Sequence, residues 1–244
     1  MRFLMMHKVT PDLEADLPPP PGLIEEMGAF VGALAASGKM LAGGGLRPSA
    51  ERVRLTFRDG ARTVTRGPYQ GSNELLSGCA MIRTTTMAQA IELATRIATA
   101  TGDREIEVGP VTEPWHLGLM EKPADAPLQC LVLRKAEAAF EAGAAPPAGL
   151  ARVLDELRRE GSLVLSVGLA PSARGKRSTV AGGKRRWTDG PFAESKELIS
   201  GFCVVELADM AEAQDLAARY LAILGDNEAD ILAVSDLDVV QPQA

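Results

Sequence analysis

The spacing of apolar residues changes along this chain between the period of a strand and the period of a helix. Four short apolar runs predict buried strands. The two near-continuous runs, at residues 79–82 and 202–205, suggest central places in a sheet. The four runs cover residues 3–7, 79–82, 128–133 and 202–205. Between them, apolar residues recur at helical spacing, which predicts four amphipathic helices. The helical segments span residues 23–34, 87–97, 150–157 and 210–220.

A hairpin and two more strands complete the pattern of each half. Val53, Leu55 and Phe57 alternate with polar residues before the Asp59-Gly60 pair, which is a two-residue turn signal. Both halves therefore show the same order, β-α-β-β-β-β-α-β. Two helices on one face of an antiparallel sheet in this order indicate the ferredoxin-like, split βαβ arrangement of the α+β class. We expect each half to fold as such a unit.

The two halves are also related in sequence. Pro191 lies 123 positions after Pro68, and the same offset holds without a gap from about residue 37 to about residue 108, with about 27 identities. A duplicated unit of this length is the size of a domain rather than of a solenoid repeat. We predict a first repeat at 1–118, a linker at 119–126 and a second repeat at 127–244. Two such sheets can pack face to face as an intramolecular pseudo-dimer, with a cavity between them or at their rim.

Composition narrows the classes of partner. The net charge of −6 argues against nucleic acid and anionic membranes, because both are bound through an excess of Lys and Arg. No apolar run is long enough to span a bilayer and no signal peptide is evident, so we expect a cytoplasmic protein. Cys79, Cys130 and Cys203 show no CxxC spacing and are interpreted as buried thiols. We expect no metal and no cofactor.

One segment resembles a known family. The run from Asp189 to Glu197, together with the Gly-Leu-x-Pro-Ser segments that end at Ser49 and Ser172, resembles the DGPF branch of the YCII-related superfamily. The resemblance implies a dimeric α+β barrel, here within one chain, whose relatives mostly have unassigned functions. Some relatives are associated with alternative sigma factors. A few are enzymes on small aromatic substrates that are thought to use a His and an Asp, but Gly149 stands where that His would be.

Asp189 is the candidate catalytic residue, and two interpretations of it remain open. It is either the first residue of a turn, which accepts backbone N–H bonds, or a carboxylate at the cavity rim that serves as a general base. Its counterpart in the first repeat is Arg66, so at most one half has this carboxylate. The candidate residues for a ligand pocket are His7, Arg66, Tyr69, Arg186, Trp187 and Phe192.

Three functions are consistent with this sequence. The favoured one is binding or sensing of a small molecule, with a regulatory role as an extension. The second is acid–base catalysis on a small aromatic or anionic metabolite, with Asp189 as base and Arg66, Arg186 or His7 polarising the substrate. The third is a structural interaction module. An enclosed cavity faced by Asp189 would support the first two, and a filled core the third. We expect a monomeric pseudo-dimer or a dimer of pseudo-dimers.

Overall fold

The computed structural model of the chain describes residues 1–181, 183–225 and 228–240. Both halves contain the long helices and the strands that the periodicity predicts. The first half comprises β1 (Arg2–Lys8), α1 (Pro11–Glu14), α2 (Leu23–Ala36), β2 (Met40–Leu46), β3 (Val53–Arg58), β4 (Ala61–Arg66), β5 (Leu76–Thr84), α3 (Met87–Thr101) and β6 (Glu105–Thr112). The second half comprises β7 (Leu128–Lys135), α4 (Ala138–Glu141), α5 (Gly149–Arg159), β8 (Leu163–Leu169), β9 (Lys176–Ala181), β10 (Lys184–Asp189), β11 (Ile199–Glu206), α6 (Met210–Ile223) and β12 (Ala229–Val239). Short 3₁₀ turns lie at Ser49–Glu51, Pro114–Leu117 and Ser172–Arg174.

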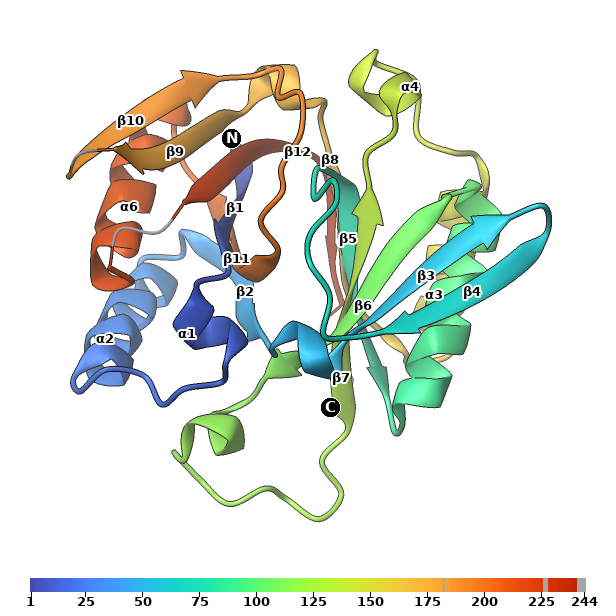
Figure 1. The fold of residues 1–244 in the computed structure, drawn as a ribbon, viewed down its shortest axis with the longest axis horizontal. Helices are drawn as coiled ribbons and strands as arrows, with labels where there is room; N and C mark the ends of the chain where they lie inside the picture. The colour runs from blue at the N-terminus through green and yellow to red at the C-terminus, as the bar shows by residue number, and fades with distance from the viewer. Residues whose placement is uncertain (182, 226–227, 241–244) are drawn as a thin grey trace.

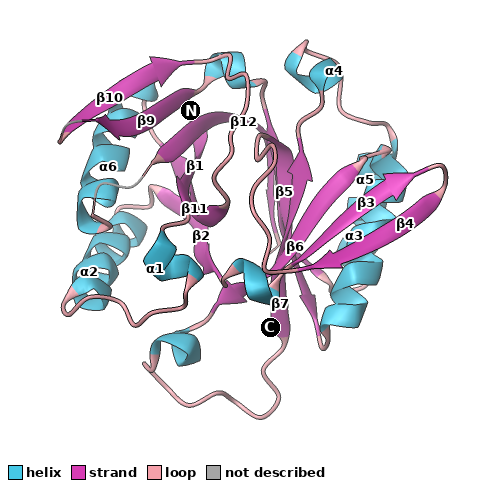
Figure 2. Ribbon diagram, in the orientation of Figure 1, coloured by secondary structure: helices cyan, strands magenta, loops and turns pink. Residues whose placement is uncertain are grey.

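Eight of the strands close into a barrel. They pair in the order β1-β11-β2-β6-β7-β5-β8-β12, and β12 pairs again with β1. The hairpins β3–β4 and β9–β10 extend from β6 and β12 outside this ring. Helices α2 and α6 cover one side of the barrel, and α3 and α5 cover the other (Figure 1, Figure 2). The chain therefore has a mixed fold in which the helices lie outside a closed antiparallel sheet.

The two sequence repeats exchange strands. One half of the barrel has the order β2-β11-β1-β12, and the other has the order β8-β5-β7-β6. Each is the strand order of a split βαβ unit, but its first β-α-β comes from one repeat and its second from the other. This differs from the expectation that each half folds as its own unit. The physical reason is that two similar repeats can complete each other's strand pairing as well as their own, and periodicity does not reveal which pairing occurs.

Three apolar clusters stabilise this architecture. One lies between α3, α5 and the sheet, and a second lies between α2, α6 and the sheet. The third fills the barrel interior with buried side chains from strands on both sides, among them Leu4, Met6, Met81, Leu131, Leu165, Val204 and Leu232. Side chains thus occupy the space between the two halves of the sheet, which was one of the two places, with the rim, where we expected a ligand cavity.

The recurring Gly-Pro and Pro-Ser segments hold each other in place. A Cβ atom added at Gly190 would lie far inside van der Waals contact of the Ser172 carbonyl oxygen, and the same holds for Gly67 and the carbonyl oxygen of Ser49. The Ser172 Oγ atom accepts a hydrogen bond from the backbone N–H of Phe192 at 3.0 Å. The Ser49 Oγ atom accepts the equivalent bond from Tyr69 at 3.2 Å. The most recognisable motif of the sequence therefore has an architectural role in both repeats.

Candidate functional site

The residues predicted around the signature do not converge on one site. Asp189 ends β10 with its side chain 75% exposed, and its carboxylate pairs with Lys176 on β9. No backbone N–H of the described chain donates to it, which differs from the turn interpretation. Arg186 is also exposed on β10, while Trp187 packs in part against the core beneath α2 and α6. Arg66 is exposed at the end of β4. This strand belongs to the other hairpin, and the two hairpins extend from opposite sides of the barrel (Figure 1).

His7 belongs to the core. Its side chain lies on the outer face of β1, where the Nδ1 atom is 2.7 Å from the hydroxyl oxygen of Tyr220 on α6. Gly201 lies opposite on β11, and a Cβ atom there would collide with the His7 ring. Burial, followed by the charges of Lys8 and Arg52, lowers the pKa of His7 to about 4. A neutral, enclosed imidazole of this kind serves packing rather than ligand contact.

Tyr69 and Phe192 lie at equivalent places in two buried charge clusters. The guanidinium of Arg54 stacks over the Tyr69 ring at 4.3 Å, and that of Arg177 stacks over the Phe192 ring at 4.4 Å. Each arginine also pairs with a buried carboxylate and lies beside a buried lysine. We call these groups the Glu107 cluster (Arg52, Arg54, Glu74, Glu107 and Lys135) and the Asp230 cluster (Lys8, Arg177 and Asp230).

The carboxylates of Glu107 and Asp230 are ionised despite their burial. Burial alone raises the pKa of Asp230, but the adjacent Lys8 and Arg177 outweigh it, so the pKa lies below its ordinary value. The same balance, with Lys135 and Arg52 as the main neighbours, lowers the pKa of Glu107. Each cluster joins residues of both repeats. Lys8 pairs with Asp230 across β1 and β12 in one cluster, and Lys135 pairs with Glu74 across β7 and the segment before β5 in the other. The clusters therefore help to specify the exchanged strand pairing.

Sequence reasoning missed these clusters, although a signal for them exists. Arg54 and Arg177 are separated by the repeat offset, as are Glu107 and Asp230. A charged residue kept in both copies of an otherwise apolar strand indicates a buried ion pair, because an unpaired charge would not be retained there.

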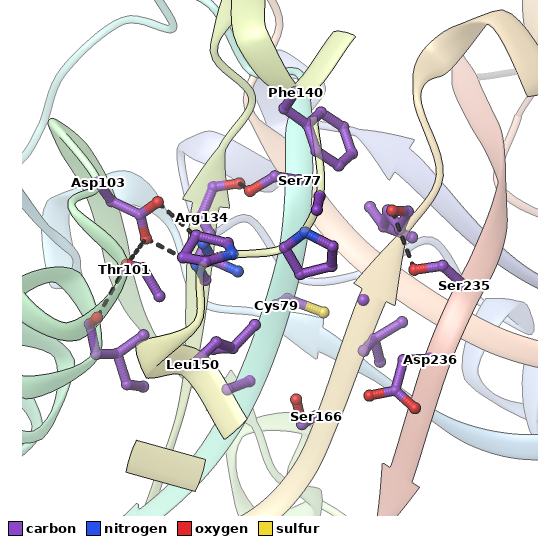
Figure 3. Close-up of a pocket in the computed structure, with 18 of the residues that line it drawn as sticks. Ser77, Cys79, Thr101, Asp103, Arg134, Phe140, Leu150, Ser166, Ser235 and Asp236 are labelled. Atoms are coloured by element: carbon purple, nitrogen blue, oxygen red, sulfur yellow. Dashed lines mark hydrogen bonds and ion pairs between the residues drawn. The ribbon is translucent and has the colours of Figure 1, made fainter. Parts of the chain in front are cut away.

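A cavity of about 500 Å³ opens on the outer face of the sheet, between β5, β7 and β8, the end of α3 and the segment that enters α5 (Figure 3). Its apolar wall includes Ile97, Phe140, Pro146, Pro147, Leu150 and Leu154. We expected a cavity between the two sheets or at their rim. This cavity is lined by Ile97 and Leu154 from the layer between sheet and helices, and also by Val167 of the barrel-interior cluster. None of the predicted site residues lines it.

Arg134 supplies the principal charge in this cavity. Its Nε and Nη2 atoms donate to the Asp103 carboxylate at 2.7 and 3.0 Å, and Thr101 donates to the same carboxylate at 2.7 Å. The Arg134 side chain is only 7% exposed, and its Nη1 atom donates to no group in the described part of the chain. A buried guanidinium with one free edge can accept an anionic group from a ligand.

The strand alignment explains why the cavity occurs in one half. Arg134 aligns with His7, and Ile97 aligns with Tyr220 at the repeat offset. On the cavity side, the Arg134 side chain turns to Asp103 and the Ile97 side chain leaves space. On the other side of the barrel, the His7 and Tyr220 rings contact each other and fill the equivalent space. The pocket therefore arises from residues in which the repeats differ.

The cavity lining also includes a thiol. Burial raises the pKa of the Cys79 thiol to about 12, so this side chain is not a thiolate near neutral pH. The described lining residues include no histidine. Across residues 1–181, 183–225 and 228–240, no cluster of three or more His, Cys, Asp and Glu side chains could hold a metal ion. The same residues form no helix long and apolar enough to cross a membrane.

Comparison with known proteins identifies the family. The family model of the YCII-related domain matches residues 1–113 and again residues 128–222, so this chain belongs to the YCII-related family and contains its domain twice. The two matches agree with the tandem duplication found in the sequence. No curated protein and no solved structure matches the chain.

Proposed function

We propose that this YCII-related protein binds a small molecule with an anionic group in the cavity beside Arg134. The observation that carries the proposal is the cavity itself, which combines about 500 Å³, a mostly apolar wall and a buried guanidinium. Ligand pockets commonly have this volume and this composition, with few polar groups that fix orientation. The segment before Leu150 lines this cavity. Some YCII relatives have a histidine in that segment. Glycine at position 149 supports binding without acid–base chemistry.

The alternatives receive less support. Catalysis by Asp189 would need its carboxylate to face a substrate, whereas it is exposed and paired with Lys176. A purely structural module is favoured by the filled barrel interior but does not account for the cavity beside Arg134. A regulatory role would follow if ligand binding changed the surface formed by the segment 144–148, which borders the cavity.

We further propose that the chain is a DGPF-type, one-chain equivalent of a dimeric α+β barrel, and that it acts in the cytoplasm as a monomer or as a dimer of such barrels. The exchanged strands support this assignment. Each half of the barrel uses one β-α-β from each repeat, as two separate copies would do if they assembled by exchange. Nucleic acid is not part of the proposal, since the net charge is −6.

Two substitutions of Ser166 test ligand binding. Its side chain lines the cavity and makes no hydrogen bond in the described structure, so Ser166→Met fills the space and Ser166→Ala leaves it open. The proteins are screened by thermal shift against a panel of small aliphatic and aromatic carboxylates. A ligand at about 100 times its Kd stabilises the folded state by about 2.7 kcal/mol, which corresponds to a rise in Tm of about 5–10 °C.

We expect this rise in wild type and in Ser166→Ala but not in Ser166→Met. A panel without any response would contradict the proposed function. So would a ligand that stabilises Ser166→Met as much as wild type, because it would bind elsewhere.

A further inference from the structure

Within the described part of the chain, one charged side chain in the cavity wall has no ionic or hydrogen-bonding partner. Arg134 pairs with Asp103, Lys135 pairs with Glu74, and Glu137 lies 4.0 Å from Arg104. Asp236 also lines the cavity, but its carboxylate contacts no charged group or hydrogen-bond donor in the described residues. The wall therefore offers one uncompensated negative charge.

The local backbone positions this carboxylate. Strand β12 pairs with β8 through Val234 and Asp236, and the register skips Ser235. The Ser235 hydroxyl donates to the carbonyl oxygen of Leu169 at 3.1 Å, which holds the irregular segment against β8. Gly168 lies opposite Asp236, and a Cβ atom there would be 3.3 Å from the Asp236 Cβ atom. A glycine at this position keeps the floor of the cavity open beside the carboxylate.

The two charges lie on different sides of the cavity. Figure 3 shows Arg134 and Asp103 on one side and Ser235 and Asp236 on the other, with Cys79 and Ser166 between them. The buried Cys79 thiol is neutral, and the walls around the middle of the cavity are apolar. The arrangement is that of a pocket with an anion-binding end, an apolar middle and a cation-binding end.

We infer that the ligand is bipolar: it carries a carboxylate or similar anion for Arg134 and an ammonium group for Asp236, on either side of an apolar body. This inference rests on the proposed function and specifies its ligand class. Amino acids with a separated amine and carboxylate have this chemistry. Because Asp236 is exposed at the mouth of the cavity, its contribution to affinity is that of a partly screened ion pair, about two- to fivefold.

Matched pairs of ligands test the inference. In the pairs 6-aminohexanoate with heptanoate and 4-(aminomethyl)benzoate with 4-ethylbenzoate, a methyl group replaces the ammonium group at nearly constant size. Their Kd values are measured by calorimetry at low ionic strength with wild type, Asp236→Asn and Ser166→Met. Asn keeps the size of the side chain and removes its charge.

In at least one pair, we expect wild type to bind the amino compound about two- to fivefold more tightly than its alkyl partner. We expect Asp236→Asn to remove this preference while leaving the Kd of the alkyl compound unchanged, and Ser166→Met to bind neither. The inference is overturned if neither pair shows the preference, or if the preference survives in Asp236→Asn. Either result leaves the proposed function standing as long as other carboxylates respond in the Ser166 screen.

Discussion

The Asp230 cluster offers a quantitative test of how the repeats are joined. Asp230 is 2% exposed and Lys8 is 1% exposed, with 2.9 Å between the Lys8 Nζ atom and the carboxylate. Arg177 donates to the same carboxylate from Nε at 2.6 Å and from Nη2 at 3.1 Å. Asp230→Asn keeps the volume of the side chain but leaves two cations in a buried site without their counter-charge. Removing one member of a buried ion pair commonly costs about 3–5 kcal/mol.

This loss is measurable against a control ion pair that also involves β1. Arg2 and Glu206 form an exposed ion pair between β1 and β11, so Glu206→Gln should cost less than about 1 kcal/mol. Thermal unfolding followed by circular dichroism should show a Tm about 6–20 °C lower for Asp230→Asn, given the size of the chain. If Asp230→Asn and Glu206→Gln had equal, small effects, the buried cluster would not stabilise the exchanged strand pairing.

Three further predictions concern individual residues. The pKa of His7 in the folded protein is depressed to about 4, so between pH 6.5 and 4 only the unfolded chain binds the proton. The free energy of unfolding therefore falls on acidification by up to about 1.4 kcal/mol per pH unit. Urea unfolding at several pH values should show a smaller pH dependence of this free energy for His7→Gln. Gly190→Ala should destabilise by more than about 2 kcal/mol in urea unfolding, because the new methyl group meets a backbone carbonyl, whereas Gly28→Ala in α2 meets nothing and should stabilise by about 0.5–1 kcal/mol. Equal effects at the two glycines would refute the packing argument. Asp189→Asn should change neither the Kd of a ligand in calorimetry nor Tm by more than about 2 °C, and a lost ligand response would instead restore Asp189 as a site residue.

Much of the secondary structure could be predicted from the sequence, because local periodicity determines it. The spacing of Leu150, Val153, Leu154 and Leu157 indicated α5, and the repeat offset indicated that both halves share one order of elements. The strand pairing could not be predicted in this way. Two repeats that resemble each other present similar strand edges, so the choice between pairing within a repeat and pairing between repeats depends on three-dimensional contacts such as Lys8 with Asp230.

The candidate site was predicted poorly for a related reason. The signature around Asp189 is the most recognisable segment, but its glycine and its aromatic residue serve contacts with Ser172. The cavity instead depends on where the repeats differ, at Arg134 in place of His7 and at Ile97 in place of Tyr220. The difference between aligned residues was visible in the sequence. Its consequence for space was not, because volume depends on how the side chains on both elements pack.

The most direct test of the central claim is a titration of the ¹⁵N-labelled protein with a carboxylate that responds in the thermal-shift screen, followed through backbone amide chemical shifts. Binding in the cavity predicts that the largest changes occur near Thr101, Arg134, Ser166 and the opening of α5 at Leu150. Changes centred on β9, β10 and Asp189, with the amides around the cavity unaffected, would contradict the account and place the ligand at the signature hairpin.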